Sequence, residues 1–486
     1  MPGLDKRERL KMPHIAIPKR PPQERIADFC EVTLTYSPEQ AIAEASRCVE
    51  CSKPPCVAAC PLGNRIKDWL VLTAEGRFAE AAQVSQATSN MPEICGRICP
   101  QDRLCEDVCI VGVKHAPVAI GAIERFINDH AIAEHGLPVP SVEPSSGHRV
   151  AVVGAGPAGL ACAEELVKKG HRVTVYDVHP EPGGLLRYGI PGFKLDSAVV
   201  NRRIDYLLGL GVQFVGSVRV GQDVTLNELL ESGFHAVFLA TGATMPKRPD
   251  LPGIGLAGVE DALPFLIRNN VDGSEVRDDL SGLHVVVLGG GDTAMDCVRT
   301  ARRLGAAAVT CVYRRDEPNM PGSRREVAAA KEEGVEFRWL TAPVRFVDSG
   351  TGRLGTIECV GMALGEPDAQ GRRRPIAVGG SDFLIEADLA ILAFGFDGSP
   401  VAGGYGLQTT DSRTYVVDTG GMTTRPGIFA GGDVVRGPDL VVTALRDGRR
   451  AAEAIDAYLK TTYVSTRAWR TLRADYQLAH PNGKKS

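Results

Sequence analysis

Two glycine-rich turns, each lying between an apolar strand and a helix, constrain the fold of this chain more than any other feature. The first is in "HRVAVVGAGPAGLACAEELVKKGHRVTVYD", where Gly154, Gly156 and Gly159 form G-x-G-x-x-G and the second strand ends in Asp177. In such a unit the glycines allow a tight turn, a close approach to a pyrophosphate and close helix–strand packing. The helix N-terminus attracts the anion, and the acid binds a ribose hydroxyl. The stretch therefore predicts a Rossmann-like nucleotide-binding domain.

A second turn of this kind follows in "HVVVLGGGDTAMDCVRTARRLGAAAVTCVYRRDEPNMPGSRREV". It reads G-x-G-x-x-A, and the next strand, around 308–313, ends in two arginines instead of an acid. Arginine at this place suits a 2′-phosphate, so the turn predicts NADPH in preference to NADH; a solvated basic pair is the alternative. Arg324 and Arg325 either face the same phosphate or belong to a surface helix. The expected NADPH contacts are Gly289, Gly291, Asp292, Thr293, Ala294, Arg314 and Arg315.

The order of the two units is typical of flavin-dependent pyridine-nucleotide oxidoreductases, in which the NADPH unit is inserted between two parts of the FAD unit. "FLATGA" at 238–243 ends the first part, and in "TRPGIFAGGDVVRG" an apolar strand runs into Asp433. A carboxylate there suits a ribityl hydroxyl of FAD, with a helix N-terminus beside it to offset charge on the reduced flavin. The stretch 183–194 either surrounds the flavin or is only a shaped loop. The expected FAD contacts are Gly154, Gly156, Gly159, Asp177, Gly184, Thr241, Gly242, Gly432 and Asp433.

Eight of the thirteen cysteines fall into two crowded groups, spaced C-x2-C-x4-C-x3-C-P and C-x3-C-x5-C-x3-C. The first group is Cys48, Cys51, Cys56 and Cys60, and the second is Cys95, Cys99, Cys105 and Cys109. Compact runs ending in C-P are typical of [4Fe-4S] clusters, in which the fourth cysteine of a run commonly ligates the other cluster. A zinc site, the alternative, usually shows two well-separated C-x2-C pairs. The isolated cysteines are expected to be small buried apolar residues: Cys30, Cys162, Cys297, Cys311 and Cys359.

Clusters in the same chain as a flavin and NADPH unit indicate how electrons leave. Disulfide reductases of this plan need a cysteine pair near the flavin, and no C-x-x-C pair occurs beyond residue 109. NADPH delivers a hydride, clusters accept one electron at a time, and a flavin does both. Hydride transfer requires no general acid or base, so no catalytic side chain is assigned.

The chain before the first glycine-rich turn has helical spacing, with Ser37 as an expected helix cap and Pro38 in the first turn. A Pro- and Ser-rich stretch then separates it from the strand–helix alternation. The predicted fold class is multidomain: an N-terminal all-α iron–sulfur domain followed by two α/β Rossmann-like nucleotide-binding domains of the FAD/NAD(P) disulfide-reductase-like type. The expected domains are 1–145, binding two [4Fe-4S] clusters; 146–280, the first part of the FAD domain; 281–395, the NADPH domain; and 396–486, the second part of the FAD domain.

Charge and hydropathy narrow the functional classes. The formal net charge is −4 and no Lys/Arg-rich block occurs, so nucleic-acid binding is not expected. Every apolar run is shorter than a membrane span. The N-terminus is basic but has no apolar h-region, so the chain is expected to be a soluble cytoplasmic protein. Its thirteen cysteines should then be thiols or metal ligands, because that compartment keeps disulfides reduced.

Nearly the whole chain resembles the small (beta) subunit family of bacterial NADPH-dependent glutamate synthases. The stretches that carry the resemblance include "CVECSKPPCVAACPLGNRIKDW", "SQATSNMPEICGRICPQDRLCEDVC", "VAIGAIERFIND", "GGLLRYGIPGFKL" and "YRRDEPNMPGSRREV". The resemblance implies that hydride passes from NADPH to FAD, and single electrons then pass through [4Fe-4S] clusters to a large subunit with FMN and a [3Fe-4S] centre. In that hetero-oligomer L-glutamine, 2-oxoglutarate and NADPH would give two L-glutamates.

The resemblance, which extends to the N-terminal region of dihydropyrimidine dehydrogenase, also implies two ligand sets. One cluster would be held by Cys48, Cys51, Cys56 and Cys109, and the other by Cys60, Cys99, Cys105 and a fourth ligand. That ligand is either Cys95 or Glu124, which stands where the dehydrogenase uses a glutamine.

Two other readings remain open. Similar chains serve ferredoxin or a pyrimidine reductase as the electron acceptor. In a different class, the cysteine region would be a zinc-stabilised docking module on a flavoprotein.

Overall fold

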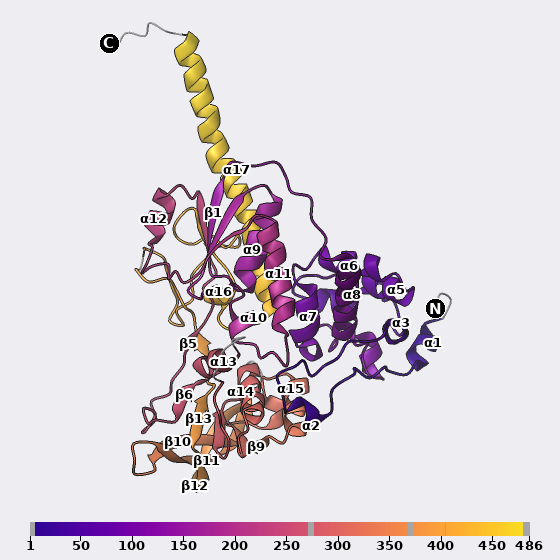
Figure 1. The fold of residues 1–486 in the computed structure, drawn as a ribbon, viewed down its shortest axis with the longest axis vertical. Helices are drawn as coiled ribbons and strands as arrows, with labels where there is room; N and C mark the ends of the chain where they lie inside the picture. Colours follow the sequence, from indigo (N-terminus) through magenta and orange to yellow (C-terminus); the bar gives the residue numbers. More distant parts are fainter. Residues whose placement is uncertain (1–4, 271–276, 368–372, 404, 480–486) are drawn as a thin grey trace. The chain divides into compact units, whose positions relative to one another are not determined.

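The computed structural model describes residues 5–270, 277–367, 373–403 and 405–479, with side chains as far as residue 462. These residues form two compact units, each assembled from three stretches of the chain (Figure 1). Unit 1 comprises Met1–Leu137, Gly183–Arg203 and Thr244–Asp397, and unit 2 comprises Pro138–Pro182, Ile204–Ala243 and Gly398–Ser486. The predicted cluster region and the predicted NADPH region therefore lie in the same unit.

The first part of unit 1 is helical, as the spacing predicts. Its helices are α1 (Lys6–Lys11), α2 (Pro22–Arg25), α3 (Pro38–Ala45), α4 (Pro55–Ala59), α5 (Ile66–Ala74), α6 (Phe78–Gln86), α7 (Pro92–Ile98) and α8 (Ile120–His135), with 3-10 turns η1 (Gln101–Arg103) and η2 (Ile110–Val113). The predicted cap is confirmed, because Ser37 and Gln40 form a capping box at the start of α3. Trp69 of α5 is fully buried, and its indole N–H donates to Asn64 Oδ1 at 3.1 Å.

The second part of unit 1 contains a parallel five-stranded sheet in the order β6-β13-β7-β8-β9. Its strands are β6 (Val259–Asp261), β7 (His284–Leu288), β8 (Ala308–Tyr313), β9 (Glu336–Trp339) and β13 (Leu389–Leu392). Helices α13 (Ala262–Asn270), α14 (Asp292–Arg303) and α15 (Arg324–Glu332) connect them. Four of the five residues of β7 are buried, which explains the continuous apolar run "HVVVL".

An antiparallel sheet that the sequence reading did not predict also belongs to unit 1. It has the order β10-β11-β12, with β10 (Thr341–Asp348), β11 (Leu354–Pro367) and β12 (Arg373–Glu386). A further pair joins β5 (Met245–Pro246) to β14 (Phe396–Asp397), where the chain enters and leaves this part of the unit.

Unit 2 is built on a second parallel sheet, ordered β15-β4-β1-β2-β3. Its strands are β1 (Arg149–Val153), β2 (Arg172–Tyr176), β3 (Gln213–Val215), β4 (Ala236–Leu239) and β15 (Ile428–Ala430), and its helices are α9 (Pro157–Lys168), α12 (Leu226–Glu231), α16 (Asp433–Arg436) and α17 (Val441–Ala479). Two further helices are α10 (Leu185–Tyr188), in unit 1, and α11 (Ser197–Gly209), which carries the chain from unit 1 into unit 2.

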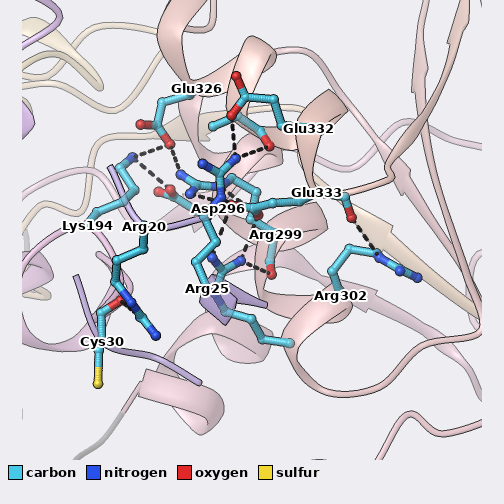
Figure 2. Close-up of polar contacts among 12 residues, drawn as sticks. Arg20, Arg25, Cys30, Lys194, Asp296, Arg299, Arg302, Glu326, Glu332 and Glu333 are labelled. Atoms are coloured by element: carbon cyan, nitrogen blue, oxygen red, sulfur yellow. Dashed lines mark hydrogen bonds and ion pairs between the residues drawn. The ribbon is translucent and has the colours of Figure 1, made fainter. Parts of the chain in front are cut away.

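One buried carboxylate, that of Glu333, joins three arginines in unit 1; Figure 2 labels it with two of them, Arg25 and Arg299. Glu333, which follows α15, lies 2.9 Å from Arg25 Nε, 2.8 Å from Arg299 Nη2 and 2.7 Å from Arg303 Nη1, and its side chain is fully buried. Phe193 lies beneath the guanidinium groups of Arg299 and Arg303, 4.6 and 3.9 Å from its ring centre. Burial alone would raise the pKa of Glu333, but hydrogen bonds from the arginines of α14 lower it to about 2.

We expect Glu333→Gln to destabilise unit 1 by about 3–5 kcal/mol, because three buried guanidinium groups lose their shared anion. The folded-state pKa lies below the ordinary 4.5, so this stabilisation is present above that pH and is lost as the pH falls toward 2. Urea unfolding as a function of pH measures both effects.

The matched control is Glu336→Gln, three residues along, where the side chain is 57% exposed and pairs with Arg338. That variant is expected to change stability by less than about 1 kcal/mol. Equal losses in the two variants would contradict the role given to Glu333.

Candidate functional site

Four cysteines from both groups line one hollow in the helical part of unit 1. Cys48, Cys51, Cys56 and Cys109 share the wall of this hollow with apolar residues that include Leu70, Val111 and Ile120. The structure thus brings together the four residues expected for one cluster, although Cys109 is far from the others in sequence. A backbone N–H from Glu50, which has a left-handed φ of 49°, donates to the Cys48 sulfur.

The environment of these thiols fits a positively charged group. Burial and neighbouring sulfurs raise the pKa of Cys48 to about 11 and that of Cys56 to about 12. Thiolates form here only when positive charge compensates for burial, and iron supplies that charge. Among the residues that the structure describes, no three His, Cys, Asp or Glu side chains converge as the ligands of one metal ion do.

The remaining candidates lie in the same helical part of unit 1. Cys95 is on α7, Cys99 follows that helix, and a hydrogen bond between the two side chains, together with burial, raises the pKa of Cys99 far above its ordinary value. Burial raises the pKa of Glu124 on α8 to about 8, and its Oε1 accepts from Asn64 Nδ2 at 2.7 Å and Ser85 Oγ at 3.3 Å.

The Glu124 carboxyl group also affects the pKa values of two other candidate thiols. Glu124 raises the pKa values of Cys60 and Cys105, in both cases after burial as the larger cause. All five candidates for the second cluster are therefore neighbours.

The first glycine-rich turn leaves β1 in unit 2 with the predicted backbone. A side chain at Gly154, which has φ of 109°, would meet the Ala240 carbonyl oxygen at 2.3 Å, and one at Gly159 would meet the Gly154 oxygen at 1.9 Å. Nothing lies within 4 Å of the same position at Gly156, the N-cap of α9. This end of α9 is open for a phosphate, while the other two glycines are required by packing.

Asp177 follows β2 and braces this turn. Its Oδ2 accepts from the Ala155 N–H at 2.6 Å, and its Oδ1 accepts from the His179 N–H at 2.8 Å. The predicted ribose-binding acid thus also fixes the loop.

The other expected FAD residues of unit 2 follow neighbouring strands. Thr241 Oγ1 donates to the Ser399 carbonyl at 2.5 Å, and the Ser399 N–H donates to Gly242 at 3.0 Å. After β15, Gly432 packs against Ala158 of α9, where an added side chain would come within 2.9 Å. Asp433 then begins α16, and burial raises its pKa to about 6. Gly184, with φ of 52°, belongs to unit 1 and is the N-cap of α10.

The second glycine-rich turn leaves β7 in unit 1. A side chain at Gly289 would meet the Ala393 carbonyl oxygen at 2.3 Å, while Gly291, the N-cap of α14, has open space. Asp292 is the first residue of that helix, with Thr293 next, and Ala294 is fully buried. The turn has the geometry of a dinucleotide loop.

The arginines near this turn have different surroundings. Arg314 follows β8 and is exposed, whereas Arg315 Nε donates to the Arg373 carbonyl at 3.0 Å. Arg325 bonds to Gln101 Oε1 at 3.2 Å and pairs with Glu106. To face the 2′-phosphate, the other expectation for Arg325, this side chain would have to leave Glu106.

Comparisons with known proteins match a family to the cysteine-rich region and another to the region with the two glycine-rich turns. Residues 25–136 match the family "dihydropyrimidine dehydrogenase domain II, 4Fe-4S cluster", and residues 148–448 match "pyridine nucleotide-disulphide oxidoreductase". The glutamate synthase [NADPH] small chain of Escherichia coli K12 is 47% identical over 457 residues, covering 91% of this chain and 96% of its own. The chain belongs to the glutamate synthase small-chain family.

A second member of this family, from Azospirillum brasilense, is 49% identical over 455 residues, covering 91% of this chain and 94% of its own. The structure of FprA from Mycobacterium tuberculosis in complex with NADPH aligns with a TM-score of 0.57 at 22% identity, covering 69% of this chain and 90% of that one, and supports the fold. The predicted family and fold class are confirmed, and the chain is an oxidoreductase with an iron–sulfur domain. In the described residues, no helix is both long and apolar enough to cross a membrane.

Sequence reasoning missed the residues between Cys99 and Cys105. Arg103 lies 3.0 Å from Asp292 Oδ2, and Asp102 Oδ2 accepts from the Arg324 N–H at 3.0 Å. No local pattern in "CPQDRLC" signals these contacts, because their partners are about two hundred residues away.

We expect Cys109→Ser to lower bound iron as much as Cys48→Ser, since both sulfurs line the same hollow. Iron content and absorption near 400 nm of the purified chain measure this loss. Cys30→Ser is the control and should retain full iron, because Cys30 is an isolated cysteine. The expectation that Cys30 is buried is wrong, since the structure exposes it. Full iron in the Cys109 variant would remove it from the ligand set.

Proposed function

We propose that this chain is the electron-entry subunit of an NADPH-dependent glutamate synthase. It takes hydride from NADPH onto FAD and passes single electrons through two [4Fe-4S] clusters to a large subunit with FMN and a [3Fe-4S] centre. The complete reaction converts L-glutamine, 2-oxoglutarate, NADPH and a proton into two L-glutamates and NADP⁺. The observation that carries the proposal is the hollow lined by four thiols, in the same compact unit as a dinucleotide turn.

FAD is held by unit 2 and supplies the conversion from a two-electron donor to one-electron acceptors. The open N-terminus of α9 at Gly156 would receive its pyrophosphate, and Asp433 would accept a hydrogen bond from a ribityl hydroxyl. Burial raises the pKa of Asp433, and a hydroxyl that donates to this carboxylate would offset the cost of that burial. Asp177 binds the adenosine ribose while it braces the turn.

NADPH is bound by the second turn. Its pyrophosphate faces the N-terminus of α14 at Gly291, and the 2′-phosphate lies against Arg314, which is exposed directly after β8. Arg315, tied through Nε to Arg373, lines the same edge. These residues bind and orient the nicotinamide, so the chain needs no acid or base for the transfer.

The first cluster is held by the four thiols of the hollow, and the second by Cys60, Cys99, Cys105 and Glu124. The choice of Glu124 over Cys95 rests on the cost of burial. A buried thiol costs little when idle, whereas a buried carboxylate whose hydrogen-bond donors are the uncharged Asn64 and Ser85 is costly without a cation. Cluster iron provides that cation, and Cys95 remains a buried thiol.

We expect Glu124→Ala to lose the second cluster, so that iron per chain falls by about half, while Cys95→Ala retains it. Iron and sulfide analysis of the two variants measures this difference. Both residues lie on neighbouring helices of the same bundle, so each variant serves as the folding control of the other. Iron loss in the Cys95 variant alone would reverse the assignment.

The whole function is tested with the purified chain and a bacterial glutamate synthase large subunit. We expect the chain alone to reduce an artificial dye with NADPH, and glutamate to form from glutamine and 2-oxoglutarate only when both subunits are present. Dye reduction without glutamate would instead identify a reductase module that serves ferredoxin or a pyrimidine reductase. Failure of dye reduction would refute the NADPH and FAD assignments.

A further inference from the structure

The loop between Cys99 and Cys105 contacts both segments that form the dinucleotide turn of unit 1. Arg103 Nη2 lies 3.0 Å from Asp292 Oδ2, and Arg103 Nη1 donates to the Pro321 carbonyl. Asp102 accepts from the Arg324 N–H at 3.0 Å and from Ser323 Oγ at 3.3 Å. The loop therefore holds α14 and the start of α15 at the same time.

The contacted segments are also bonded to each other. The Ser323 N–H donates to Asp292 Oδ1 at 2.8 Å, and the Gly322 N–H donates to the Gly290 carbonyl at 2.9 Å. Asp292 thus divides its two oxygens between Ser323 and Arg103. Asp102 supplies a cap to α15 that its own N-cap, Ser323, does not provide, because no side-chain hydrogen bond is made there.

The loop is in turn fixed by the cluster domain. Gln101 packs so closely on Gly121 of α8 that an added side chain would come within 2.2 Å of its amide nitrogen. Glu106 is buried, accepts from the Gly121 N–H at 3.0 Å and pairs with Arg325. The position of Arg103 therefore depends on the helices that carry the cysteines.

We propose that Arg103 is a positioning residue for NADPH, contributed by the iron–sulfur domain. It neutralises Asp292, whose charge at the N-terminus of α14 would otherwise repel the pyrophosphate, and it holds the Pro321 loop against the turn. The inference rests on the proposed function, because it takes the second turn as the NADPH site. By linkage, binding of the cluster and binding of the nucleotide then change each other's free energy by the same amount.

The test is NADP⁺ binding to the full-length chain, measured by titration calorimetry at low salt. Arg103→Gln is expected to raise the dissociation constant about 5- to 10-fold, a modest factor because both partners are about one-third exposed. Adding Asp292→Asn to that variant is expected to recover most of the affinity, because the uncompensated charge is then gone. The loss should also shrink at high salt.

An unchanged dissociation constant for NADP⁺ in Arg103→Gln would overturn the proposal. If the double variant, Arg103→Gln with Asp292→Asn, binds NADP⁺ as poorly as Arg103→Gln alone, the electrostatic role of Arg103 would be overturned. Arg338→Gln, at an exposed arginine of β9, is the matched control for loss of one positive charge. Equal flavin and iron content in all variants excludes misfolding. If the unmodified chain fails to bind NADP⁺, the proposed function fails, which is a different result from unchanged binding in the variant.

A second readout follows from the linkage. Saturating NADP⁺ should slow the release of iron to a chelator from the unmodified chain and should do so less in Arg103→Gln. Equal protection in both chains would contradict coupling through Arg103.

Discussion

The buried carboxylate of Glu333 is the interaction on which unit 1 depends. It binds Arg25 from the N-terminal segment and Arg299 and Arg303 from α14, so two regions distant in sequence share one anion (Figure 2). The segment 183–203 joins them, because Phe193 lies beneath two of these guanidinium groups and Lys194 pairs with Asp296 at 2.8 Å. Buried charges are costly unless each has a partner of opposite sign, so these ion pairs fix the arrangement of the three segments.

The two glycine-rich turns have the same backbone but different charged surroundings. In unit 2 the acid after the second strand, Asp177, accepts from the turn itself. In unit 1 the equivalent position is the exposed Arg314, and the acid is Asp292, on the helix and balanced by Arg103. The two proposed nucleotide sites thus share one turn geometry and differ in the charge of the side chains around it.

The elements with strong local signals could be predicted from the sequence. The strands around both turns, the capping box at Ser37 and the helical cysteine region are set by residues close together in the chain. The antiparallel β10–β12 sheet was missed, since its register depends on partners rather than on local spacing. The arginine–carboxylate contacts of Arg103 and Arg325 were beyond reach for the same reason: charged residues are common on surfaces, and only the fold shows which ones meet.

Unit 2 is assembled from three separate stretches of the chain, and this has a consequence during synthesis. Strand β4 pairs with β1 on one side and, on the other, with β15, which leaves the ribosome nearly two hundred residues later. Until then β4 is an unprotected edge of four buried apolar residues, the kind of surface that promotes mispairing between nascent chains. The long separation between β4 and β15 therefore leaves this sheet incomplete until both strands have been synthesised.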